Sequence, residues 1–187
     1  MKQKRKPLRK IYGFSLNEWA MNGHRDALAI KELIRDWQRL SRHFNNGRFI
    51  ELGCGTGIFG HLISKIRKDL IPYGIDKDHN KIAFANTKKF GRNFQCCDYF
   101  GFTSFERFQT AIIFIEKNIF HLPKIIGLAR IWENTAPKDS RLIIFCYDRS
   151  YRKTFYGFVT KAFITIGLKS KLSHQDKRFL VISKQKC

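Results

Sequence analysis

Three glycines and one acidic residue fall within residues 51–57, Glu-Leu-Gly-Cys-Gly-Thr-Gly, between an apolar run and an amphipathic stretch. Gly53, Gly55 and Gly57 permit tight turning and let a ligand approach the main chain and the start of the next helix. Glu51 stands at the end of the apolar run, where its carboxylate would repel a pyrophosphate. We therefore predict a loop that binds a small ligand with a cationic amino acid portion and a sulfonium.

The same loop also fits a second glycine pattern. Residues 55–60 also fit the dinucleotide pattern G-x-G-x-x-G, with Asp76 about twenty positions further on. Two features decide against a nicotinamide cofactor: Gly53 precedes that pattern, and Glu51 is the wrong charge beside a pyrophosphate.

The elements that must position this loop alternate along the chain. Short apolar runs occupy 48–52, 71–76, 93–97, 111–116 and 142–147, and helical spacing of apolar residues predicts helices over 58–66 and 122–132. Strands that alternate with helices indicate a mostly parallel sheet covered on both faces, an α/β three-layer sandwich. A further helix over 151–162 and a hairpin of 168–174 with 178–184 would close the sheet with an antiparallel strand.

The N-terminal third has a different organisation. Residues 1–13 resemble a flexible basic arm, with six Lys or Arg in the first ten positions. Residues 14–46 are predicted to form two helices, the first opened by a capping box of Ser15 and Glu18. Residues 47–187 then form the ligand-binding domain.

The segment 51–57 resembles the first motif of class I S-adenosylmethionine (SAM) methyltransferases, and later segments extend the likeness over about residues 47–148. The resemblance implies a seven-stranded Rossmann-like sheet of order 3-2-1-4-5-7-6. It assigns Asp76 to the ribose hydroxyls, and Asp98 with Tyr99 to the adenine. Cofactor-binding residues are then Glu51, Gly53, Cys54, Gly55, Gly57, Asp76, Asp98 and Tyr99.

The chain also departs from that family. Gln109-Thr110 stands where many members carry an acidic residue, and no Asn-Pro-Pro-Tyr or Asp-Pro-Pro-Tyr motif follows the fourth strand. This departure argues against methylation of adenine N6 or a glutamine amide. Asp76 and Asp98 could also serve as helix N-caps, and Asp78 is a close substitute for Asp76.

Acceptor-side residues are expected at the carboxyl ends of the fourth and fifth strands, where ligands of open α/β sheets bind. The catalytic candidates are Glu116 and Asn118 as positioning groups and His121 as a general base. Tyr147 and Asp148 are further candidates. We expect Cys146 to be a packing residue rather than a nucleophile.

The net charge indicates the class of partner. The chain has 36 Lys and Arg against 15 Asp and Glu, which gives a net charge of +21 on 187 residues. Such a field attracts polyanions, so RNA (ribosomal or transfer RNA) is the favoured acceptor and partner, with an anionic membrane surface next. The alternatives are a methyltransferase for a small molecule or lipid and a non-catalytic RNA-binding protein. The five cysteines have no metal-ligand spacing, so we expect no metal and a reducing, cytoplasmic location.

Overall fold

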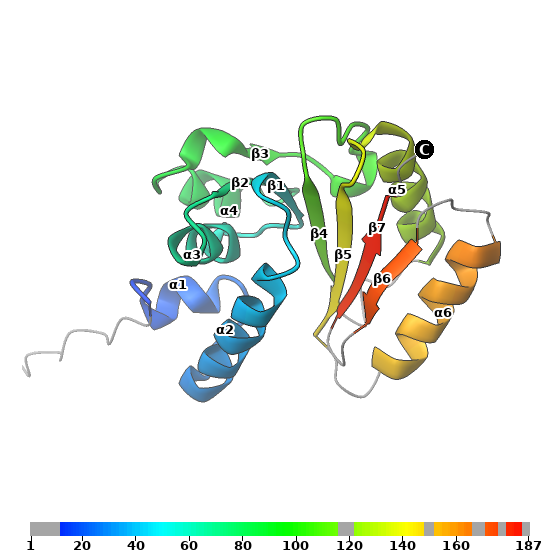
Figure 1. Cartoon of the computed structure of the whole chain (residues 1–187). Coiled ribbons are helices and arrows are strands. Elements are labelled where there is room, and N and C mark those ends of the chain that lie inside the picture. The colour runs from blue at the N-terminus through cyan, green and yellow to red at the C-terminus, as the bar shows by residue number, and fades with distance from the viewer. Residues whose placement is uncertain (1–11, 116–121, 148–151, 166–170, 176–178, 185–187) are drawn as a thin grey trace, which may run out of the picture.

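The computed structural model describes residues 12–115, 122–147, 152–165, 171–175 and 179–184 (Figure 1). Its centre is a seven-stranded sheet of order β3-β2-β1-β4-β5-β7-β6. The strands are β1 (Gly47–Leu52), β2 (Leu70–Asp76), β3 (Phe94–Cys96), β4 (Thr110–Ile115), β5 (Arg141–Cys146), β6 (Lys171–Gln175) and β7 (Phe179–Ser183). The first five are parallel, and β7 is antiparallel to β5 and β6. The predicted mostly parallel sheet with an antiparallel C-terminal strand is confirmed.

Helices cover both faces of this sheet. They are α1 (Leu16–Ala20), α2 (Ala27–Ser41), α3 (Ile58–Ile66), α4 (His79–Ala85), α5 (Leu122–Thr135) and α6 (Arg152–Thr165). Successive strand residues point to opposite faces, so Ile112 packs with α1, α2 and α3, whereas Ile113 packs with α5 and α6. The result is the expected three-layer sandwich.

Two details of the secondary structure differ from the sequence-based expectation. The bounds of six strands shift by one residue, as at β3, which is only three residues long, and β6 is described over Lys171–Gln175 where 168–174 was expected. The helix α4 was not predicted, because it is seven residues long and buries only Ile82 and Ala85. Asp78 caps it, with Oδ1 accepting the Asn80 and Lys81 amide protons.

The N-terminal helices share the core of the sheet. The capping box is present, since Ser15 Oγ accepts the Glu18 amide proton and Glu18 accepts that of Ser15. The helix α1 buries Trp19, whose ring stacks on Trp37 of α2 at a centroid distance of 5.8 Å. This packing ties residues 14–46 to the sheet, whereas residues 1–11 of the predicted arm lie outside the described residues.

Hydropathy also bears on membrane crossing. Among the helices that the structure describes, none is both long enough and apolar enough to cross a bilayer.

Candidate functional site

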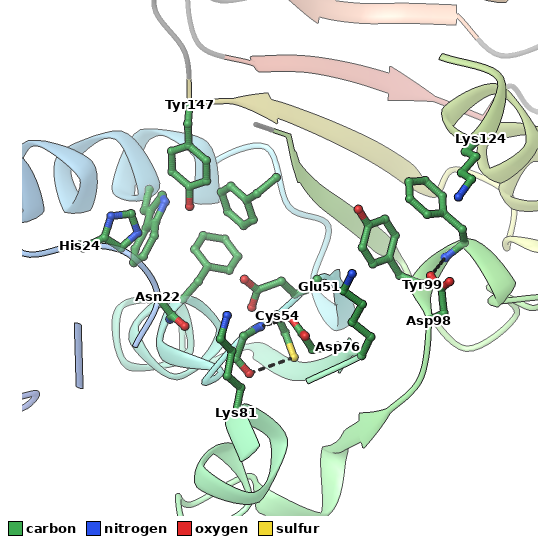
Figure 2. A pocket seen from close by; sticks show the side chains of 17 residues that line it. Asn22, His24, Glu51, Cys54, Asp76, Lys81, Asp98, Tyr99, Lys124 and Tyr147 are labelled. Carbon is green, nitrogen blue, oxygen red and sulfur yellow. Dashed lines mark hydrogen bonds between the residues drawn. The ribbon is translucent and has the colours of Figure 1, made fainter. Parts of the chain in front are cut away.

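A cavity of about 540 Å³ opens at the carboxyl ends of the central strands (Figure 2). Residues in or just after β1, β2, β4 and β5 line it together with residues of α2 and of the α1–α2 connection. The lining residues are Asn22, His24, Trp37, Glu51, Gly53, Cys54, Gly55, Phe59, Asp76, Lys77, Lys81, Asp98, Tyr99, Phe100, Phe114, Lys124 and Tyr147. The cavity therefore joins the glycine loop to two acidic strand ends and a group of aromatic rings.

The glycine loop turns sharply between β1 and α3. Gly53, Gly55 and Gly57 all have left-handed φ angles, of +77°, +54° and +68°. The amides of Gly53 and Cys54 both donate to the carbonyl of Ile75, at 2.8 and 2.9 Å, which anchors the loop to β2. L-residues with side chains rarely adopt these angles, which explains the choice of glycine.

Asp76 braces the same loop from the end of β2. Its Oδ2 accepts the Gly55 amide proton at 2.8 Å, and its Oδ1 accepts the Asp78 amide proton at 2.9 Å. Each carboxylate oxygen has a second acceptor site. Because Asp76 is only partly buried and lines the cavity, both oxygens can also accept from a ligand.

Glu51 is the most unusual group in the cavity. Its side chain is only 4% exposed, and its Oε2 has no hydrogen-bond partner in the described structure. Burial, reinforced by the nearby Asp76 carboxylate, raises the pKa of Glu51 well above its ordinary value of 4.5. A backbone contact from Gly60 lowers this pKa only in part. A buried carboxylate with one oxygen left without a partner is costly, so this position suits a ligand that brings a cation.

Asp98 and Tyr99 form the opposite end of the cavity from His24 (Figure 2). Asp98 is the N-cap of a short 3₁₀ helix (Tyr99–Gly101), and its Oδ1 accepts the Phe100 amide proton at 3.0 Å. A Cβ at Gly53 would lie 3.5 Å from the Tyr99 ring. The Tyr99 ring therefore lies close to Gly53, and both line this end of the cavity.

Asn22 connects the N-terminal segment to the glycine loop. Its Nδ2 donates to Thr56 Oγ1 at 2.9 Å, and its Oδ1 accepts the Thr56 amide proton at 3.1 Å. A Cβ at Gly55 would lie 2.5 Å from Asn22 Oδ1. The sequence does not predict this role for Asn22, because nothing local relates it to a loop more than thirty residues away.

The cofactor-binding candidates gather in one place. Glu51, Gly53, Cys54, Gly55, Asp76, Asp98 and Tyr99 all line the cavity. Gly57 is not among the lining residues and is the N-cap of α3. Asp78, the substitute for Asp76, acts as a helix cap outside the lining set.

Most of the acceptor-side candidates fall outside the part of the chain that the structure describes. Glu116, Asn118, His121 and Asp148 lie outside the described residues, so their roles stay predictions. Tyr147 lines the cavity. Cys146 is fully buried in the core, as expected of a packing residue, and its amide donates to the Tyr156 hydroxyl at 3.3 Å.

The expected effect of Gly57→Ala is a loss of stability. The new methyl group would sit at a left-handed φ and about 2.9 Å from the Phe94 ring, so we expect a cost of roughly 2 kcal/mol or more. Gly127→Ala in α5 is the matched control, because a Cβ there meets nothing within 4 Å and alanine favours a helix. Urea unfolding of both variants measures the difference, and equal stabilities would contradict the strain at Gly57.

Comparison with known proteins shows similarity in fold. No protein-family model and no curated protein matches the sequence. Among solved structures, a putative SAM-dependent methyltransferase from Methanococcus maripaludis superposes with a TM-score of 0.71 at 10% identity, over 98% of each chain. The plantazolicin methyltransferase BpumL, in complex with a pentazolic desmethylPZN analogue and SAH, gives 0.62 at 14% identity over 91% of this chain and 90% of that one.

A third structure, the N-methyltransferase NodS from Bradyrhizobium japonicum WM9, gives a TM-score of 0.58 at 14% identity, over 87% of this chain and all of that one. The sheet also has the strand order 3-2-1-4-5-7-6 that the sequence resemblance implied. The chain has the fold of the class I SAM-dependent methyltransferases.

Proposed function

We propose that this protein is a SAM-dependent methyltransferase. The observation that carries the proposal is the buried Glu51 carboxylate, whose Oε2 lacks a partner in a cavity beside the glycine loop. SAM carries an ammonium group and a sulfonium, so it supplies the cation that this carboxylate lacks. The neighbouring folds support the choice, since one of them was solved with SAH.

The lining residues suit the three parts of this cofactor. Glu51 would accept from the amino group of the methionine portion, and the free acceptor sites of Asp76 would take the ribose hydroxyls. Asp98 and Tyr99, at the far end, would hold the adenine by a hydrogen bond and by ring contact. When bound, SAM supplies an electrophilic methyl group.

The protein's own contribution is then mainly positional. An in-line methyl transfer needs the acceptor atom held close to the methyl carbon and water kept away. The N-terminal segment contributes to this positioning, because the Asn22 side chain forms two hydrogen bonds with Thr56 of the glycine loop. Removal of an acceptor proton stays with the predicted base, His121.

RNA is the acceptor that the charge favours. The excess of cations over acids across the whole chain attracts a phosphate backbone. Three lysines, Lys77, Lys81 and Lys124, also line the cavity, where they can contact the phosphates of a bound RNA. A small-molecule acceptor is the second candidate, favoured by the neighbour bound to a desmethylPZN analogue.

Methyl transfer into cell fractions tests this function. Wild-type protein and labelled SAM are incubated with fractionated extract, with and without nuclease, beside Glu51→Gln. We expect nuclease-sensitive label that the variant does not produce, and loss of transfer at high salt because counterions compete with phosphate contacts. Label that resists nuclease and is found in small molecules would show that the acceptor is a small molecule and not RNA. Failure to bind SAM would instead indicate a non-catalytic binding protein.

A further inference from the structure

Five aromatic side chains gather at one end of the cavity, and we call this group the aromatic slot. It consists of His24, Trp37, Phe59, Phe114 and Tyr147. They come from the α1–α2 connection, α2, α3, β4 and the residue after β5. In Figure 2 the slot residues His24 and Tyr147 lie on the opposite side of Glu51 from Asp98 and Tyr99. The slot is thus separate from the adenine end.

The rings of the slot form a continuous wall. Trp37 meets Phe59 edge-on at 5.0 Å, and Phe59 meets Phe114 edge-on at 4.8 Å. Phe114 and Tyr147 stack at 5.4 Å with only 21° between their planes. His24 completes the wall, with its ring centroid 5.8 Å from that of Tyr147.

Not all of this wall belongs to the core. Trp37 and Phe59 are buried, but His24, Phe114 and Tyr147 are only partly buried while they line the cavity. Large aromatic surface left open to a cavity gains free energy when another flat ring covers it. The slot therefore has apolar faces available to a ligand.

A polar group in the slot also lacks a partner. The Trp37 side chain is 3% exposed, and its indole Nε1–H has no acceptor in the described structure. A buried donor without an acceptor costs free energy, which a ligand with an oxygen or ring nitrogen would recover. Trp37 thus selects for a hydrogen-bond acceptor on the ligand.

The slot carries no fixed positive charge. Burial lowers the pKa of His24 below its ordinary value of 6.5, which favours the neutral form of its ring. In Figure 2 Lys124 lies on the far side of Glu51 from Tyr147, and Lys81 lies below Glu51, near Asn22. Among the five described residues of the slot, none offers a counter-charge to a phosphate or carboxylate, whereas a neutral ring does not need one.

We infer that the aromatic slot is the acceptor subsite and holds a neutral, planar heteroaromatic ring that accepts a hydrogen bond from Trp37 Nε1–H. The inference rests on the proposed function, because it takes the other end of the cavity as the cofactor's. The ring is either an unstacked base of RNA or a free heteroaromatic molecule. Both offer the same chemistry to the slot.

Binding of quinoline to the SAH-saturated protein, followed by NMR titration, tests the slot. Quinoline has a flat ring and one ring nitrogen acceptor, and cyclohexanone, which has an acceptor but no aromatic face, is the comparison probe. We expect quinoline to bind and cyclohexanone not to. Tyr147→Leu should weaken quinoline about tenfold through lost ring contact, whereas Tyr147→Phe keeps the ring and serves as the matched variant.

Trp37→Phe separates the hydrogen bond from the packing, because it removes only the indole N–H and part of the ring. We expect it to weaken quinoline by roughly fivefold. SAH affinity, measured on every variant by calorimetry, shows that the protein is folded and tests the cofactor proposal separately. Two results would refute the assignment of the slot as the acceptor subsite. One is normal SAH binding without quinoline binding. The other is normal SAH binding with equal quinoline affinities of Tyr147→Leu and Tyr147→Phe.

A competition arm identifies the source of the ring. Single-stranded RNA added to the quinoline complex displaces the probe if the slot takes an unstacked base. Displacement by a heteroaromatic fraction of cell extract, with RNA leaving the probe bound, assigns the slot to a free small molecule. Either result places a heteroaromatic ring in the slot.

Discussion

The Glu51→Gln variant is expected to lose SAM and SAH affinity by about 100-fold or more, because removing one partner of a buried charge pair costs roughly 3–5 kcal/mol. The amide keeps the shape of the side chain but not its charge. SAH has the same amino group as SAM and lacks the sulfonium, so an equal loss for both ligands identifies the amino group as the partner. Calorimetric titration of both ligands measures the effect.

The same substitution is expected to stabilise the protein without ligand. The carboxylate of Glu51 is buried with an unpartnered oxygen, and its pKa is raised by burial. An acid whose pKa is higher in the folded state contributes stability below its ordinary pKa of 4.5, and this contribution is lost as pH rises through the raised value. The stability advantage of Glu51→Gln should therefore grow from acid to neutral pH.

Ligand affinity follows the same titration with the opposite sign. A cation binds only the ionised carboxylate, so wild-type SAM affinity should rise with pH until Glu51 is ionised in the free protein. Glu51→Gln should lack this rise. Glu106→Gln, at an exposed site away from the cavity, is the matched control and should behave as the wild type. Tight SAM binding by Glu51→Gln would refute the role of the carboxylate.

Asp76→Asn is expected to weaken SAM binding by about 10- to 100-fold, since an unsatisfied donor costs roughly 1–3 kcal/mol. The carboxylate accepts amide protons from Gly55 and Asp78, one on each oxygen. An asparagine has only one oxygen, so one of these amides would face an NH₂ group. The glycine loop then loses its brace, and the ribose hydroxyls lose an acceptor.

Asp78→Asn is the control for this second prediction. Asp78 lies two residues away and has a structural task, because it caps α4. Asparagine is as good an N-cap as aspartate, so the helix and the SAM affinity should both persist. Fluorescence titration with SAM compares the two variants, and equal affinities would remove Asp76 from the binding site.

The sequence by itself was enough to predict the sheet and to select candidate residues that the structure brings together around one cavity. The apolar runs before Glu51 and Asp76 are local patterns, and parallel strands bring their carboxyl ends to one edge. Glycines at three left-handed positions are a local requirement as well. Local chemistry therefore sufficed wherever one segment of the chain fixed the geometry.

Only the tertiary structure revealed the aromatic slot and the hydrogen bonds between Asn22 and Thr56. Trp37, Phe59 and Phe114 follow the ordinary apolar spacing of core residues, and nothing in that spacing separates a ring that faces a cavity from one that faces the core. The difference depends on how α1 and α2 pack against the ends of β4 and β5, which are far away in the sequence. Types and local order of residues determined the fold and the glycine loop, and long-range packing determined the aromatic slot.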